Sequence, residues 1–170
     1  MKTIIFSTIV ATVLSITTTH SSFANGASGK KTVFNGPIER TAFKLSGDPS
    51  FKGSENFVKA FPEAMVKSYE TQGDKTKVTF TWNGDALEAY YDLDGNLLAT
   101  SHQLIPENLP MSVKLQIRDN YKDYIIAQAL EFYHTENGLC YFVMIRKDRK
   151  GLILQVTPDG NMNVVKRLKS

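Results

Sequence analysis

The spacing of hydrophobic residues predicts a helix at the start of the patterned part of the chain. Phe57, Phe61, Met65 and Tyr69 recur every four residues, which is the period of one helix face. Ser54 is a suitable N-cap residue for such a helix. Because Pro62 lacks a backbone N–H, we expect it to divide this helix into two short pieces.

The pattern changes to strict alternation at residue 77. Val78, Phe80 and Trp82 fall on one face of the predicted strand 77–82. Asn83-Gly84 is a typical two-residue hairpin turn. On the returning strand the pattern puts Leu87, Ala89 and Tyr91 on the inner face and Glu88 and Tyr90 on the outer face.

The rest of the chain repeats this arrangement. A turn at Asp94-Gly95 leads into a strand over 97–104, and Leu109, Val113, Ile117 and Tyr121 then mark a second amphipathic helix. Four further strands, separated by turns rich in glycine, are predicted over 125–134, 139–147, 152–157 and 162–168.

These elements predict an α+β fold. We expect two helix-then-antiparallel-meander repeats that together form one broad antiparallel sheet, with the helices packed on one face.

The N-terminal residues have the pattern of an export signal. Lys2 precedes an apolar stretch over residues 4–16, and Ser22-Phe23-Ala24 places small residues before a cleavage point at Asn25. The stretch is short for a membrane span, so an uncleaved anchor is the less favoured alternative. We expect a signal peptide over 1–24, a flexible or partly docked segment over 25–53 and the folded domain over 54–170. The protein is then periplasmic or secreted, with no membrane insertion after cleavage.

Composition is that of one globular domain. Hydrophobic residues make up 42% of the chain, and the formal net charge is only +3, so nucleic acid is not an expected partner. Cys140 is the only cysteine, which excludes an intramolecular disulfide. It lies in an apolar run, where a buried thiol is the expected role.

Three stretches of core and turn residues carry a resemblance to a known family. They are Phe-Pro-Glu-Ala-Met over 61–65, Val-Thr-Phe-Thr-Trp-Asn-Gly over 78–84, and Ala-Tyr-Tyr-Asp-Leu-Asp-Gly over 89–95. With Leu109-Pro110, Tyr121 and the run 141–156, the chain from 54 to 169 resembles the PepSY-like family of small exported bacterial proteins. The resemblance implies a fold similar to the β-lactamase inhibitor protein, an exported location and a binding or inhibitory role. It implies no catalytic residue.

No catalytic or metal-binding set is evident from the sequence. His102 and His134 have no cysteine, histidine or acid at ligand spacing, and Asp92 and Asp94 fit a hairpin turn better than a calcium loop. Cys140 has no neighbouring histidine or cation to activate it. We therefore expect a protein that is not an enzyme and that needs no cofactor or metal.

The outer sheet face is the candidate binding surface. Strand alternation favours Glu88, Tyr90, Tyr133, Phe142 and Met144 as contact residues, and aromatic and methionine side chains are common at interface cores. The alternative is that residues 32–53 cover this face, because Phe34, Phe43 and Leu45 also need burial.

The function that these observations favour is an exported, non-enzymatic binding or inhibitor-like module of the cell envelope. Its partner would be another exported protein. The alternative is a structural or assembly component of the envelope that self-associates through the open sheet face.

Overall fold

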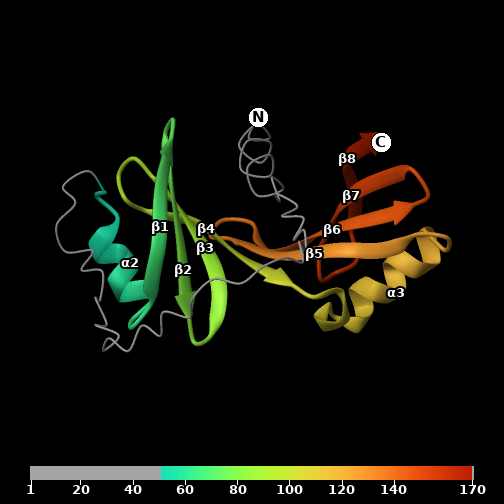
Figure 1. Ribbon diagram of the computed structural model, residues 1–170, viewed down its shortest axis with the longest axis horizontal. Helices are drawn as coiled ribbons and strands as arrows, with labels where there is room; N and C mark the ends of the chain where they lie inside the picture. Colours follow the sequence, from blue (N-terminus) through green and yellow to red (C-terminus); the bar gives the residue numbers. More distant parts are fainter. Residues whose placement is uncertain (1–50, 170) are drawn as a thin grey trace, which may run out of the picture. The chain divides into compact units, whose positions relative to one another are not determined.

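The structure, a computed structural model, describes residues 51–169 (Figure 1). These residues form one antiparallel sheet of eight strands with two short α-helices and one 3-10 turn. The helices are α2 (Ser54–Ala60) and α3 (Met111–Asn120), and the 3-10 turn is η1 (Pro106–Asn108). The strands are β1 (Met65–Gln72), β2 (Lys75–Trp82), β3 (Asp85–Asp92), β4 (Leu97–Leu104), β5 (Ile125–His134), β6 (Gly138–Lys147), β7 (Lys150–Val156) and β8 (Met162–Lys169).

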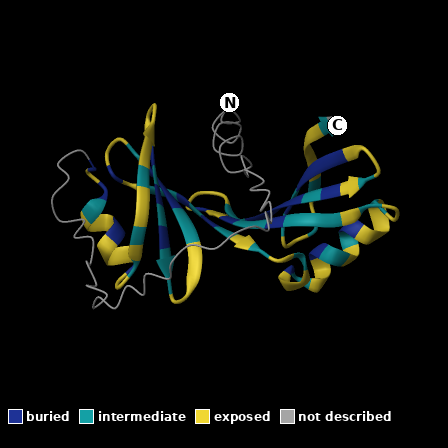
Figure 2. Ribbon diagram, viewed as in Figure 1, coloured by how far each residue is buried: buried dark blue, intermediate teal, exposed yellow. Residues whose placement is uncertain are grey.

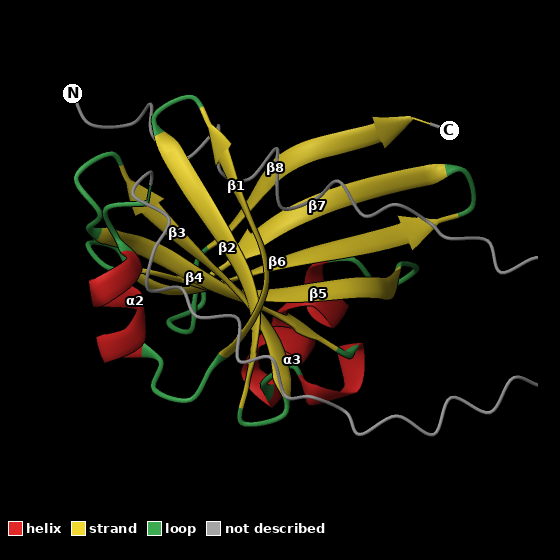
Figure 3. Cartoon of the chain, turned by 60° about the vertical axis from the view of Figure 1, so that its left-hand side comes forward, coloured by secondary structure: helices red, strands yellow, loops and turns green. Residues whose placement is uncertain are grey.

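Each strand pairs with the strand that precedes or follows it in the sequence. The order across the sheet is β1 to β8 without a crossover. Figure 3 shows β5, β6, β7 and β8 side by side. All seven strand pairs are antiparallel.

The predicted fold class is wrong. The described residues do not form two helix-and-meander repeats with helices packed over one sheet face; they form a single eight-stranded sheet accompanied by only two short helices. The physical reason is that residues 65–72, expected to continue the first helix, pair with β2 as a strand and leave α2 only seven residues long.

The first predicted helix also ends too late. Helix α2 stops at Ala60, where the N–H of Phe61 still bonds to the carbonyl of Phe57, and Pro62 follows. The expected second helical piece is strand β1, in which Met65 is exposed and Tyr69 is only half-buried. A spacing of four suits a regular strand as well as a helix, so the sequence pattern was ambiguous. In β1 the register shift between Val66 and Ser68 places Met65 and Tyr69 on different sheet surfaces.

Other local predictions are confirmed. Strands β4 and β5 have the predicted bounds, and the remaining predicted strands are each present within a few residues of their expected limits. The Asn83-Gly84 turn has positive φ at both residues, 52° and 92°, as a tight hairpin turn requires.

Helix α2 packs on the first strands through aromatic contacts. The rings of Phe57 and Phe61 lie 4.9 and 4.7 Å from the ring of Phe80, centroid to centroid. Val78, Ala89 and Tyr91 complete this cluster, together with Phe51. Burying each large side chain contributes about 1.5–3 kcal/mol, so this cluster is enough to hold so short a helix.

Helix α3 has its own cluster on the later strands. Val113 and Ile117, one turn apart, are buried against β5, β6 and β7. Their partners include Ala129, Val143 and Leu154. Figure 2 shows the resulting concentration of buried residues along β6 and β7 and the exposed outer side of α3.

The signal peptide predicted over 1–24 and nearly all of the 25–53 segment lie outside the described residues. Within residues 51–169, no helix is long and apolar enough to cross a membrane.

Candidate binding surface

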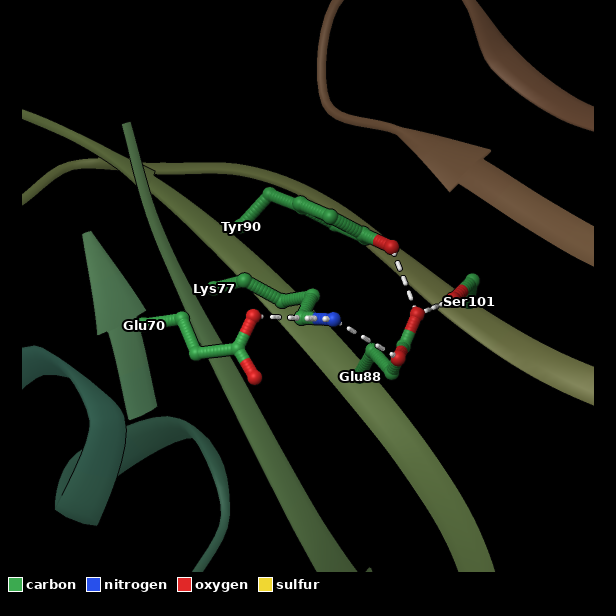
Figure 4. A network of polar contacts seen from close by, with 5 residues as sticks. All are labelled: Glu70, Lys77, Glu88, Tyr90 and Ser101. Carbon is green, nitrogen blue, oxygen red and sulfur yellow. Dashed lines mark hydrogen bonds and ion pairs between the residues drawn. The ribbon is translucent and has the colours of Figure 1, made fainter. Parts of the chain in front are cut away.

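Five side chains from β1 to β4 form a polar network (Figure 4). The ammonium group of Lys77 lies 3.6 Å from Glu70 Oε2 and 3.5 Å from Glu88 Oε1. The other carboxylate oxygen of Glu88 accepts hydrogen bonds from the hydroxyls of Tyr90 at 2.6 Å and Ser101 at 3.3 Å. One carboxylate is therefore bonded from three directions.

Strand register brings these side chains to one surface. Lys77 is directly opposite Glu70 on β1 and opposite Tyr90 on β3. Glu88 is opposite Ser101 on β4 and two residues before Tyr90, so the two project from the same side of their strand. We call this sheet surface the Tyr90 face.

The network has more negative than positive charge. Its two carboxylates face a single ammonium group, whose side chain is 19% exposed, whereas that of Glu70 is 53% exposed. Burial, and next the hydrogen bond to Glu88, raise the pKa of Tyr90, so its phenol stays protonated and acts as a donor at neutral pH. Glu88 is thus fixed, and Glu70 is the more accessible acid.

An aromatic row continues the Tyr90 face beyond this network. The rings of Tyr90 and Phe132 have centroids 6.3 Å apart, and those of Phe132 and Phe142 are 5.7 Å apart. Tyr90 and Phe132 lie on β3 and β5, on either side of β4. They can meet because β4 presents only the small side chains of Ala99 and Ser101 between them.

The structure places four of the five predicted contact residues on the Tyr90 face. Glu88 and Tyr90 are hydrogen-bonded to each other. Phe142 and Met144 lie on β6 and point to the same sheet surface as Phe132. Tyr90 and Phe142 are each only 3% exposed, so their side chains lie beneath the accessible residues of this face.

Tyr133 is the exception. It is 49% exposed and lies on the opposite sheet surface, the one that carries Ala129. The two faces of β5 are the reverse of those expected. Phe132 contacts Phe142 on the Tyr90 face, and Ala129 packs with the α3 cluster on the other face. The proposed covering of the face by residues 32–53 concerns residues outside the described ones, apart from 51–53; of these, Phe51 packs in the α2 cluster.

Sequence reasoning missed Glu70, Lys77 and Ser101. A usable indication was present, since a two-residue turn at Asn83-Gly84 fixes the hairpin register and makes Lys77 face Tyr90. Glu70 could not be found because its segment was taken as helix.

Cys140 and His134, the candidate reactive residues, each contact a polar group of a nearby residue. Burial raises the pKa of the Cys140 thiol, and its sulfur lies 3.7 Å from Gln155 Nε2. His134 Nδ1 accepts the backbone N–H of Glu136 at 3.1 Å, which holds the β5–β6 turn. Residues 51–169 contain no group of three or more His, Cys, Asp or Glu side chains that could hold a metal ion.

No protein-family model matches the chain, and no curated protein matches it. Solved structures do. A BLIP-like protein from Bacteroides fragilis is 21% identical, with a TM-score of 0.63 over 72% of this chain and 88% of that one. A DUF2874 family protein from Bacteroides ovatus is 16% identical, with a TM-score of 0.62 over 72% and 89% of the two chains.

A third similar structure is a candidate periplasmic protein from Bacteroides eggerthii. It is 13% identical, with a TM-score of 0.59 over 69% of this chain and 86% of that one. At these identities the likeness concerns the fold alone. The chain therefore has a BLIP-like fold.

Proposed function

We propose that the protein is an exported, non-enzymatic module that binds another exported protein through the Tyr90 face. The observation that carries the proposal is the network around Glu88, in which charged side chains are held in fixed positions beside an aromatic row. Fixed charges reduce the ordering that a partner must impose on binding.

The accessible contacts would be Glu70, Lys77, Glu88 and Met144. Tyr90 and Phe142 would position them, because their own side chains are buried. Tyr133 would be a contact only for a partner that reaches the opposite surface.

Three further observations support export and a binding role. The first 24 residues have the pattern of a signal peptide. A periplasmic location is assigned to one protein of the same fold, and a BLIP-like character to another. We propose as well that the protein is a member of the PepSY-like family and that it inhibits the protein it binds.

Affinity capture from the native envelope fraction tests the proposal. Wild-type protein should retain a stoichiometric partner, and Glu70→Lys should lose it, because this change reverses the most accessible charge of the network and leaves the Glu88 contacts in place. Tyr133→Ala is the matched control on the opposite surface and should retain the partner, with melting temperatures compared for all three proteins.

Loss of the partner with Tyr133→Ala but not with Glu70→Lys would contradict the proposal. Absence of any partner, combined with a concentration-dependent oligomer in sedimentation, would favour the self-associating envelope component instead.

A further inference from the structure

Strand β8 is at one edge of the described sheet. Along Met162–Lys169 it pairs with β7 on one side, and among residues 51–169 no strand pairs with its other side. The backbone N–H and C=O groups that point away from β7 are therefore a template for another strand.

The side chains of β8 leave this edge accessible. Val164 and Val165 are 38% and 43% exposed, and Lys166 and Arg167 are exposed as well. The register shifts between Ile153 and Leu154, which pair with Lys166 and Val164, so Val165 has no partner on β7. Such a bulge bends the strand locally but leaves three residues of β8 before it and four after it.

The end of β8 lies in a basic corner of the sheet. The β6–β7 hairpin beside it carries Arg146, Lys147, Arg149 and Lys150, and Lys150 and Gly151 are paired with the last residues of β8. Two acids lie nearby: Asp148 in the turn, and Asp123, which accepts a 2.6 Å hydrogen bond from Lys147. Six basic side chains, counting those of Lys166 and Arg167, thus outnumber the acids.

This charge selects among possible strands. Two copies of β8 would bring Lys166 and Arg167 of both chains close together, and like charges across a strand pair are unfavourable. An acidic strand would meet opposite charges at the same positions. The opposite edge, β1, has no such preference, because it carries both a basic residue, Lys67, and an acidic one, Glu70.

We propose that the β8 edge binds an extended acidic segment of a partner protein, which joins the sheet as an additional strand. Main-chain hydrogen bonds along β8 would supply affinity, and the basic corner would supply selectivity. Val164 and Val165 would contact apolar residues that lie next to a pair of consecutive acids in that segment, because Lys166 and Arg167 face opposite sides of the sheet. This site is separate from the Tyr90 face and does not depend on it.

The test uses the full chain and a short fluorescent peptide in which two consecutive valines are flanked on each side by two consecutive glutamates, so that glutamates lie on both faces of the added strand. Binding is followed by anisotropy, and hydrogen exchange of the amides of residues 162–168 is measured with and without peptide. We expect binding together with slower exchange of β8 amides. A peptide with a central proline should bind at least about tenfold more weakly, since proline cannot complete the ladder.

Charge-reversal variants test selectivity. Lys166→Glu with Arg167→Glu should weaken binding by about tenfold or more, because two attractive cross-strand pairs become repulsive. Lys52→Glu with Lys59→Glu is the matched control: it changes the net charge equally at two exposed positions away from β8 and should bind as wild type does. Glu70→Lys should also bind normally, which separates this proposal from that for the Tyr90 face.

Three outcomes would overturn the proposal. They are no binding, equal binding of the proline peptide without protection of β8 amides, and tighter binding to vesicles of phosphatidylglycerol than to the peptide. The last result would identify the basic corner as a surface for anionic lipid.

Discussion

The phenol of Tyr90 donates a 2.6 Å hydrogen bond to the carboxylate of Glu88, two residues earlier on the same strand. Both side chains project from one side of β3, where Tyr90 is almost fully buried. The bond thus ties the aromatic row to the charged network and fixes the carboxylate that also holds Lys77.

Tyr90→Phe should lower the free energy of unfolding by about 1–2 kcal/mol, because it removes a buried hydrogen bond to a charged acceptor. Urea denaturation of the purified protein measures this loss. In a Glu88→Gln background the same change should cost less, and equal costs in the two backgrounds would show that the two residues are not coupled.

Tyr91→Phe should have the opposite effect. The Tyr91 hydroxyl is buried in the α2 cluster and makes no hydrogen bond in the structure. Removing an unpaired buried hydroxyl should leave stability unchanged or raise it by about 1 kcal/mol. Denaturation beside Tyr90→Phe checks this sign, and a loss as large as that of Tyr90→Phe would mean that Tyr91 has a partner.

Gly95→Ala should destabilise the domain by about 3 kcal/mol or more. Gly95 has φ +81°, and a Cβ atom there would lie 2.6 Å from the backbone nitrogen of Gly53, beside the start of α2. Strain and overlap with main-chain atoms add in this case.

The control for that variant is Gly84→Ala. Gly84 also has positive φ, +92°, but open space surrounds it, so strain alone should cost about 1 kcal/mol. Thermal and urea unfolding of both variants should therefore differ clearly. Similar losses would show that the Gly95–Gly53 approach is not a tight contact.

Stability should fall in acid in part through Asp92. Its carboxylate accepts the side-chain amide of Asn96 and the backbone N–H groups of Asn96 and Asp94, and these bonds hold the pKa of Asp92 below its ordinary value of 3.8. Because the folded state has the lower pKa, the stabilisation is present above the unfolded pKa and is lost as pH falls through the folded one.

Asp92→Asn should reduce the dependence of the free energy of unfolding on pH in the acid range. Urea midpoints measured from about pH 6 down to about pH 3 record the slope, which linkage relates to protons taken up on unfolding. Asp94→Asn removes an equal charge from the same turn and should leave the slope close to that of wild type. A wild-type slope in the Asp92→Asn protein would assign the acid sensitivity to other groups.

Strands and turns could be predicted from this sequence where only one reading fits the pattern. Asn83-Gly84 fixes its hairpin, because few residue pairs accept positive φ twice in succession. Alternation in β2 and β3 correctly separated Phe80 from Lys77 and Tyr91 from Tyr90.

The prediction of which side chains face the helices was wrong where both faces of a strand carry buried residues. Ala129 and Phe132 on β5 are both buried, on opposite surfaces, so hydrophobicity alone could not tell which of them faces α3. The prediction of a helix in place of β1 was wrong for a related reason. The four-residue spacing of Met65 and Tyr69 suits a helix or a regular strand, and neither residue is fully buried. Only pairing with β2 decides between the two.

The strand order has a consequence for how the chain folds. Each ladder joins neighbours in the sequence, so loop closure between partners involves short turns in every pair except β4–β5, whose connection contains η1 and α3. Folding rates rise when native contacts are local, and a sheet of this kind can grow one hairpin at a time outwards from any turn. For a protein with so much β-structure, we therefore expect rapid folding, in which the β4–β5 pairing across α3 is the longest loop closure.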